Sequence, residues 1–142
     1  MIHYTHYTKD KDAFVTEGGL AQFLNVHLEQ YGDSQTDIQK AINYVFEKGG
    51  HIAVQHYDGK ASGAVVINQT GMGGYIPENI LVYIAVRDDL RGKGLGKKLM
   101  NEILEHLDGD IALHVEKDNP AKFLYESLGF TNPYLEMRLK RK

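Results

Sequence analysis

Three glycines and four cations lie within eight residues in the second half of the chain. The segment reads Arg91-Gly92-Lys93-Gly94-Leu95-Gly96-Lys97-Lys98. Alternate glycines let the backbone turn sharply and leave its N–H groups uncovered by side chains. Uncovered N–H groups at the start of a helix, with the helix dipole and nearby cations, bind anions. The segment therefore predicts an anion site, and the residue types favour a phosphate ester.

A strand and a helix flank this glycine-rich loop. The run Ile80 to Val86 has no charge and is rich in branched and aromatic residues, which is typical of a buried strand. The apolar residues after Gly94 recur at helical spacing and predict a helix over 94–107 with one buried face. These residues are Leu95, Leu99, Met100, Ile103, Leu104 and Leu107.

The spacing of the glycines in this loop distinguishes between several known kinds of phosphate-binding loop. A P-loop requires a glycine, four residues and then Gly-Lys-Ser/Thr, but Gly96-Lys97 is followed by Lys98. The dinucleotide pattern G-x-G-x-x-G is absent as well. The pattern that fits is R-x-x-G-x-G, from Arg91 to Gly96. It resembles the acyl-CoA pyrophosphate loop of the GCN5-related N-acetyltransferase (GNAT) family.

A second segment resembles a later motif of the same family. Residues 114–130 read HVEKDNPAKFLYESLGF. In this family a strand ends in a polar turn with Asn, and a short helix ends in Tyr shortly before Gly-Phe. Asn119, Tyr125 and Gly129-Phe130 match that pattern. The two motifs stand in the family's order and cover roughly residues 80 to 130, whereas the N-terminal half matches only in the order of its elements.

The resemblance implies acetyl-CoA as acyl donor and assigns it binding residues. Backbone groups of Ile84, Ala85 and Val86 would pair with the pantetheine arm. Arg91 would brace the loop or meet a phosphate, and Asn119 would lie beside the arm, also forming a turn before Pro120. Backbone N–H groups would hold the pyrophosphate at Gly92, Lys93, Gly94, Leu95, Gly96 and Lys97.

The catalytic residues are also expectations from the resemblance. Tyr125 matches the tyrosine proposed to protonate the departing thiolate, although a phenol near pKa 10 and a thiol near 8.5 make full transfer uphill, so a hydrogen bond could be enough. The family often places a carboxylate on or just before the central strand. Glu78 is the candidate base by elimination, with Tyr83 second; a solvated loop charge is the alternative interpretation of Glu78.

The implied activity is transfer of an acetyl group to a primary amine of a small molecule or protein, directly within a ternary complex. Two alternatives stay open. One is a non-catalytic module that binds or senses acyl-CoA, and the other is a protein that binds a different phosphorylated ligand through the same loop. The sequence leaves the acceptor undetermined.

Composition limits the remaining classes of protein. The chain has 142 residues, 16 Lys and Arg against 19 Asp and Glu, and no Cys. These values predict a single domain over 1–142 without bulk nucleic-acid binding or a disulfide framework. No apolar run approaches 18 residues and the first residues do not resemble a signal peptide, so a soluble cytoplasmic protein without a membrane span is the default expectation. A homodimer is expected from family habit. No metal site is expected, since His51 and His56, like His3 and His6, fall on opposite strand faces.

The expected fold is α/β, a mixed, mostly antiparallel sheet flanked by helices. The order is strand, two helices, three strands, helix, strand, helix, strand. Gly18-Gly19 is expected to interrupt the first helical region, and Asp58-Gly59 to form a hairpin turn. The expected elements are strand 2–8, helix 13–31, a helix between 33 and 50, strands 51–57, 60–68 and 80–86, helix 94–107, strand 110–116, helix 120–128 and strand 134–140.

Overall fold

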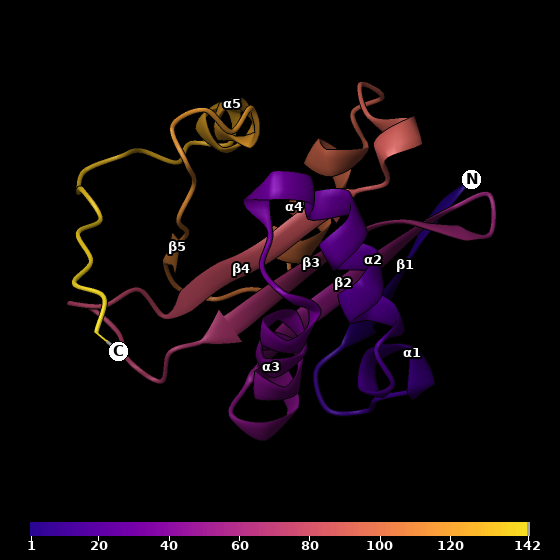
Figure 1. Ribbon diagram of the computed structural model, residues 1–142, viewed down its shortest axis with the longest axis horizontal. Helices are drawn as coiled ribbons and strands as arrows, with labels where there is room; N and C mark the ends of the chain where they lie inside the picture. The colour runs from indigo at the N-terminus through magenta and orange to yellow at the C-terminus, as the bar shows by residue number, and fades with distance from the viewer. Residues whose placement is uncertain (142) are drawn as a thin grey trace.

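The computed structural model describes residues 1–141 as one five-stranded sheet with helices on both faces (Figure 1). The sheet follows chain order, β1-β2-β3-β4-β5. The elements are β1 (Ile2–Tyr7), α1 (Ala13–Thr16), α2 (Gly19–Leu28), η1 (Glu29–Tyr31), α3 (Gln35–Glu47), β2 (Gly50–Tyr57), β3 (Lys60–Gln69), β4 (Asn79–Val86), η2 (Asp88–Leu90), α4 (Leu95–Leu104), β5 (Ile111–Ala112) and α5 (Ala121–Ser127).

The strand directions confirm the expected mixed, mostly antiparallel sheet. β1 to β4 pair antiparallel with their neighbours, and only β5 runs parallel to β4. The hairpin between β2 and β3 turns at Asp58-Gly59, where both residues have positive φ. That conformation suits a tight two-residue hairpin and explains the Asp-Gly signal.

Local sequence sets the ends of the first helices. The Asp12 carboxylate accepts a hydrogen bond from the backbone N–H of Val15 and caps α1. Gly18 then adopts φ 94°, which ends the first helix and starts α2 at Gly19, so the predicted interruption is confirmed. Ser34 caps α3 by accepting from the N–H of Asp37.

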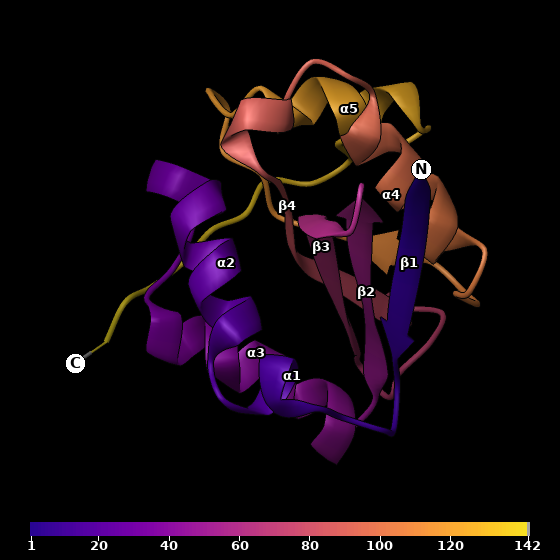
Figure 2. The ribbon, with the colours of Figure 1, turned by 90° about the vertical axis from the view of Figure 1, so that its right-hand side faces the viewer.

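Helices lie on both faces of the sheet (Figure 2), and each face carries its own hydrophobic cluster. On one face, α1, α2 and α3 bury residues such as Leu24 and Ile42 against Val54 of β2. On the other face, α4 buries Leu99 and Ile103. Alternate residues of β2 and β3 point to opposite faces, which is why both central strands are apolar along their length.

A buried polar group links the sheet to the first turn of α4. Gln55 of β2 is fully buried, and its amide Nε2 donates to the carbonyl of Leu95 at 3.1 Å and to the hydroxyl of Tyr4 at 3.4 Å. Its Oε1 accepts from the Ser62 hydroxyl at 2.9 Å. These bonds compensate for burial of the amide and fix the start of α4 against β2.

Two expectations about the C-terminal third are wrong. The expected strand 110–116 is paired only over Ile111–Ala112, and the expected strand 134–140 is neither strand nor helix. Leu135, Met137 and Leu139 are each at least 80% exposed. The apolar–charged alternation suits an edge strand, but a strand also needs a neighbouring backbone to pair with, and two-residue β5 supplies very little.

In the part of the chain that the structure describes, no helix has the length and apolar character needed to cross a bilayer.

We predict that Gln55→Met destabilises the fold by about 1–3 kcal/mol, because Tyr4 and Leu95 lose their buried hydrogen-bond donor while the side-chain volume is kept. Gln22→Met, at an exposed position of α2, is the matched control and should change stability by less than about 0.5 kcal/mol. Urea unfolding followed by circular dichroism measures both. Equal midpoints for the two variants would show that the Gln55 hydrogen bonds do not stabilise the fold.

Candidate active site

A cleft opens where β4 and β5 separate. The two strands pair only at Asn79 with Ile111 and Ile80 with Ala112, after which the chain beyond β5 diverges from β4 (Figure 1). The cleft has a volume of about 2030 Å³. Its walls are β4, residues 109–117, α5, the end of α2 and the C-terminal segment. The edge of β4 that faces it carries backbone groups without a strand partner.

A β-bulge distorts β4 within this cleft. Tyr83 pairs with Val66 and Leu81 pairs with Ile67 on β3, so Val82 is an extra residue without a partner. A bulge bends the strand and turns a backbone group away from the ladder. Farther along, Ile84, Ala85 and Val86 regain their pairing with β3 and line the cleft with their other edge.

The glycine-rich loop forms one end of the cleft. Gly92 and Gly94 have φ of 82° and 76°, and a Cβ at either position would meet no atom within 4 Å. Gly94 is the residue before α4 and provides no side-chain cap for the first turn. The first N–H groups of α4 are therefore accessible from the open side of the loop. Lys93 and Lys97 are both exposed beside them.

Arg91 connects this loop to α2 and to β4. Its Nη2 donates to the carbonyl of His27 at 2.5 Å, its Nε donates to the carbonyl of Val86 at 3.4 Å, and its Nη1 lies 3.3 Å from a carboxylate oxygen of Glu29. His27 makes a further hydrogen bond, in which its Nδ1 accepts from the backbone N–H of Asp88 at 3.3 Å. These contacts fix the start of the loop against α2 and β4.

Gly96 lies between the loop and α5. A Cβ there would contact Leu124 of α5 and Val86 of β4, each at 3.6 Å. The side-chain oxygen of Asn119 accepts from the N–H of Ala121 at 2.9 Å, which caps the start of α5. Asn119 therefore forms the turn expected before Pro120, and it also lines the cleft.

Tyr125 of α5 lines the cleft and is 8% exposed. Its ring packs against Phe130, with ring centroids 5.8 Å apart. Burial raises the pKa of the Tyr125 hydroxyl to about 12, so the phenol keeps its proton throughout the neutral range. The group can donate a hydrogen bond at neutral pH.

Glu78 stands immediately before β4, at the closed end of the β4–β5 pair. Its Oε1 accepts from the N–H of Asp110 at 3.0 Å, and its side chain packs against Gly109. The structure thus places Glu78 apart from Tyr125 and the glycine-rich loop, which share the cleft lining. Its role as base stays a prediction.

A carboxylate that the sequence analysis did not assign to catalysis lies within the cleft. Tyr83 of β4 donates to Asp33 Oδ2 at 2.5 Å, and both residues line the cleft. Burial, together with the hydrogen bond to Asp33, raises the pKa of Tyr83 well above its usual value. Fifty residues separate the pair, so no local motif joins them; the sequence named Tyr83 as the second candidate base but gave no sign of its bond to Asp33.

Comparison with known proteins identifies the domain. The sequence profile of the acetyltransferase (GNAT) domain matches residues 47–132. The chain belongs to the GNAT family. The match includes β4, β5, the glycine-rich loop and α5, and it confirms the resemblance seen in the two sequence motifs.

Curated relatives and solved structures agree with this assignment. The chain is 34% identical over 84 residues to the 5-NmdU N-acetyltransferase of Pseudomonas phage PaMx11, covering 58% of each chain. It is 34% identical over 92 residues to the N-alpha-acetyltransferase RimI of Mycobacterium tuberculosis, covering 61% of this chain and 58% of the relative. The matches thus span less than two thirds of both relatives.

The fold resembles that of the ribosomal-protein-S18-alanine N-acetyltransferase from Escherichia coli. The TM-score is 0.71 at 20% identity, with 93% of this chain and 80% of the other covered. At this identity the likeness concerns the fold.

Proposed function

We propose that the protein is an N-acetyltransferase that moves an acetyl group from acetyl-CoA to a primary amine within a ternary complex. One observation carries the proposal: a single cleft contains the free edge of β4 and the open glycine-rich start of α4. A free strand edge suits an amide-containing arm, and an uncapped helix start suits a pyrophosphate. Acetyl-CoA combines these two groups with an activated acetyl thioester.

The residues of the loop fit the phosphate end. The N–H groups from Gly92 to Lys97 would bind the pyrophosphate, because Gly92 and Gly94 have no side chains that could cover these N–H groups. Lys93 and Lys97 add positive charge, and Arg91 keeps the loop in place through its bonds to α2 and β4. Asn119 would lie beside the arm.

The middle of β4 fits the reacting end. Backbone groups of Ile84, Ala85 and Val86 would pair with the arm, and the bulge at Val82 offers a backbone N–H for a developing oxyanion. Tyr125 would stabilise the departing thiolate by donating a hydrogen bond from its hydroxyl group, which stays protonated because its pKa is raised. The chain has no cysteine to carry an acyl group, which supports direct transfer.

The base that deprotonates the amine has two candidates. Glu78 is the position assigned by the sequence, and Asp33, hydrogen-bonded to Tyr83, is the carboxylate within the cleft. Asp33 is exposed and lines the cleft, as Glu29 does, so this part of the cleft suits a cationic amine. The names of the relatives indicate different acceptors, 5-NmdU for one and an α-amino group for the other. The homodimer and the cytoplasmic location stay predictions.

We predict that Gly94→Asp weakens acetyl-CoA binding at least a hundredfold, because it places a negative side chain where the pyrophosphate would lie. Gly59→Asp is the matched control: Gly59 has φ 84° and equally open surroundings, but it lies in the β2–β3 turn. Calorimetric titration with acetyl-CoA measures both variants. Absence of binding to the unsubstituted protein would overturn the acetyltransferase proposal.

We predict that Tyr125→Phe lowers kcat about 10- to 100-fold with little change in the KM for acetyl-CoA, because the hydroxyl acts on the leaving group. Tyr57→Phe, in the strand β2, is the control. Release of free CoA in the presence of an amine panel can be followed with a thiol reagent, since the protein has no cysteine. Below about pH 11 the wild-type profile should show no ionisation of Tyr125.

If Glu78 is the base, Glu78→Gln should lower kcat/KM about a hundredfold, while the amide oxygen still accepts from the N–H of Asp110. If Asp33 is the base, Asp33→Asn should instead lower kcat/KM, while its amide oxygen still accepts the hydrogen bond from Tyr83. The measurement is kcat/KM against pH for each variant. Similar activity in Glu78→Gln and the unsubstituted protein would exclude Glu78.

A further inference from the structure

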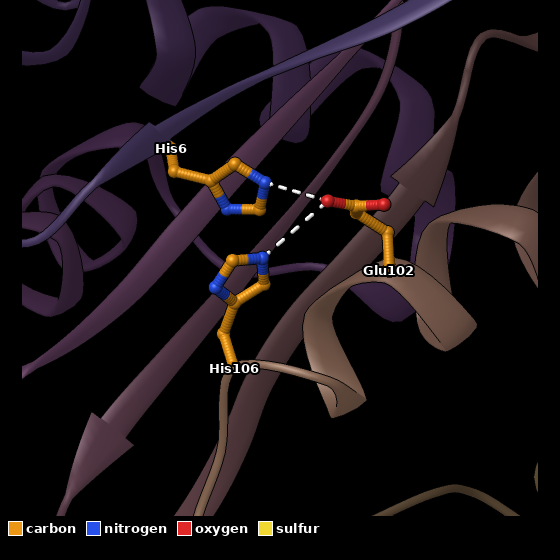
Figure 3. Close-up of side chains that lie close together, drawn as sticks. All are labelled: His6, Glu102 and His106. Atoms are coloured by element: carbon orange, nitrogen blue, oxygen red, sulfur yellow. Dashed lines mark hydrogen bonds and ion pairs between the residues drawn. The ribbon is translucent and has the colours of Figure 1, made fainter.

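Three ligand-type side chains converge on the face of the sheet that α4 covers, outside the cleft. They are His6 of β1, Glu102 of α4 and His106 just after α4 (Figure 3). β1 and β5 occupy opposite edges of the sheet, so this group lies at the edge remote from the β4–β5 cleft. None of the three lines the cleft.

The geometry of the group suits a shared ligand. Both imidazole Nε2 atoms face the same carboxylate oxygen, Glu102 Oε2, at 2.8 Å from His6 and 3.4 Å from His106. The three ligand atoms lie within 4.8 Å of one another. In a tetrahedral zinc site, bonds of about 2.0–2.2 Å place neighbouring ligand atoms about 3.3–3.6 Å apart. Small side-chain shifts would admit a metal ion.

The fold brings these residues together from two elements. Glu102 and His106 are four residues apart, which places both side chains on one face of a helical turn. His6 pairs with Ala53 of β2, and Ala53 packs in the cluster that α4 covers, so His6 points toward α4. The site thus depends on packing of α4 against the sheet.

The surroundings favour a bound cation. The group lies at the C-terminal end of α4, where the helix dipole is negative. A third imidazole, His51, is on the same face of β2 as Ala53. A negative helix end beside these side chains supports a positively charged ligand.

We propose that His6, Glu102 and His106 form a binding site for a divalent transition-metal ion of the Zn²⁺ type. Two imidazoles and one carboxylate are ligands that favour Zn²⁺ over Mg²⁺ or Ca²⁺, which prefer oxygen ligands alone. The ion would join edge strand β1 to the end of α4. This proposal is independent of acetyl transfer, because the cleft contributes no ligand.

The test is calorimetric titration of the full chain, without an affinity tag, with ZnCl₂ in a non-chelating buffer. We expect one ion per chain at micromolar affinity and no heat with MgCl₂. His106→Ala and Glu102→Gln should each weaken Zn²⁺ binding at least tenfold. The control is His3→Ala, because His3 is an exposed β1 histidine that packs on His56 without a carboxylate.

A second readout separates loss of the site from loss of the fold. Zn²⁺ at about 100 times its Kd should raise the Tm of the unsubstituted protein by roughly 5–10 °C and leave the Tm of His106→Ala unchanged. The Tm values measured in EDTA, with circular dichroism, check that the variants are folded. Absence of Zn²⁺ binding to the unsubstituted protein, or equal weakening in His3→Ala and His106→Ala, would overturn the proposal.

Discussion

The arrangement of this domain depends on one constraint, the loss of pairing between β4 and β5 after Ile80 and Ala112. A backbone edge that is not paired must find other partners, in water or in a ligand. The bulge adds to the number of unpaired backbone groups, because it removes Val82 from the hydrogen-bond ladder with β3. The open edge and the bulge together make β4 the candidate binding surface of the sheet.

Long-range contacts keep that surface rigid. Gln55 fixes the first turn of α4 to β2 from inside the core, and Arg91 ties the preceding loop to α2 and β4 from outside. Tyr31 links η1 to the turn before α5, through a bond of 3.2 Å to the carbonyl of Asp118. Gln55 and Arg91 thus hold the glycine-rich loop and the start of α4 from two sides, which lowers the entropic cost of ordering the loop when a ligand binds.

Helix α4 has a different electrostatic character at each end. Its N-terminus follows Gly94 and presents unpaired N–H groups, which favour an anion. Its C-terminus brings Glu102 and His106 to His6, which favours a cation. One ten-residue helix, buried along Leu99 and Ile103, thus connects the cleft with the opposite edge of the sheet.

The sequence by itself determined the positions of the glycine-rich loop and of α4, because alternate glycines and helical periodicity are short-range signals. Its two motifs implied the family, and the family resemblance implied the mixed sheet. Only the tertiary structure decided which distant residues meet, as Tyr83 does with Asp33 and His6 with Glu102. It also decided that residues 134–140 form no strand, because pairing requires a neighbouring backbone that an alternating sequence cannot reveal.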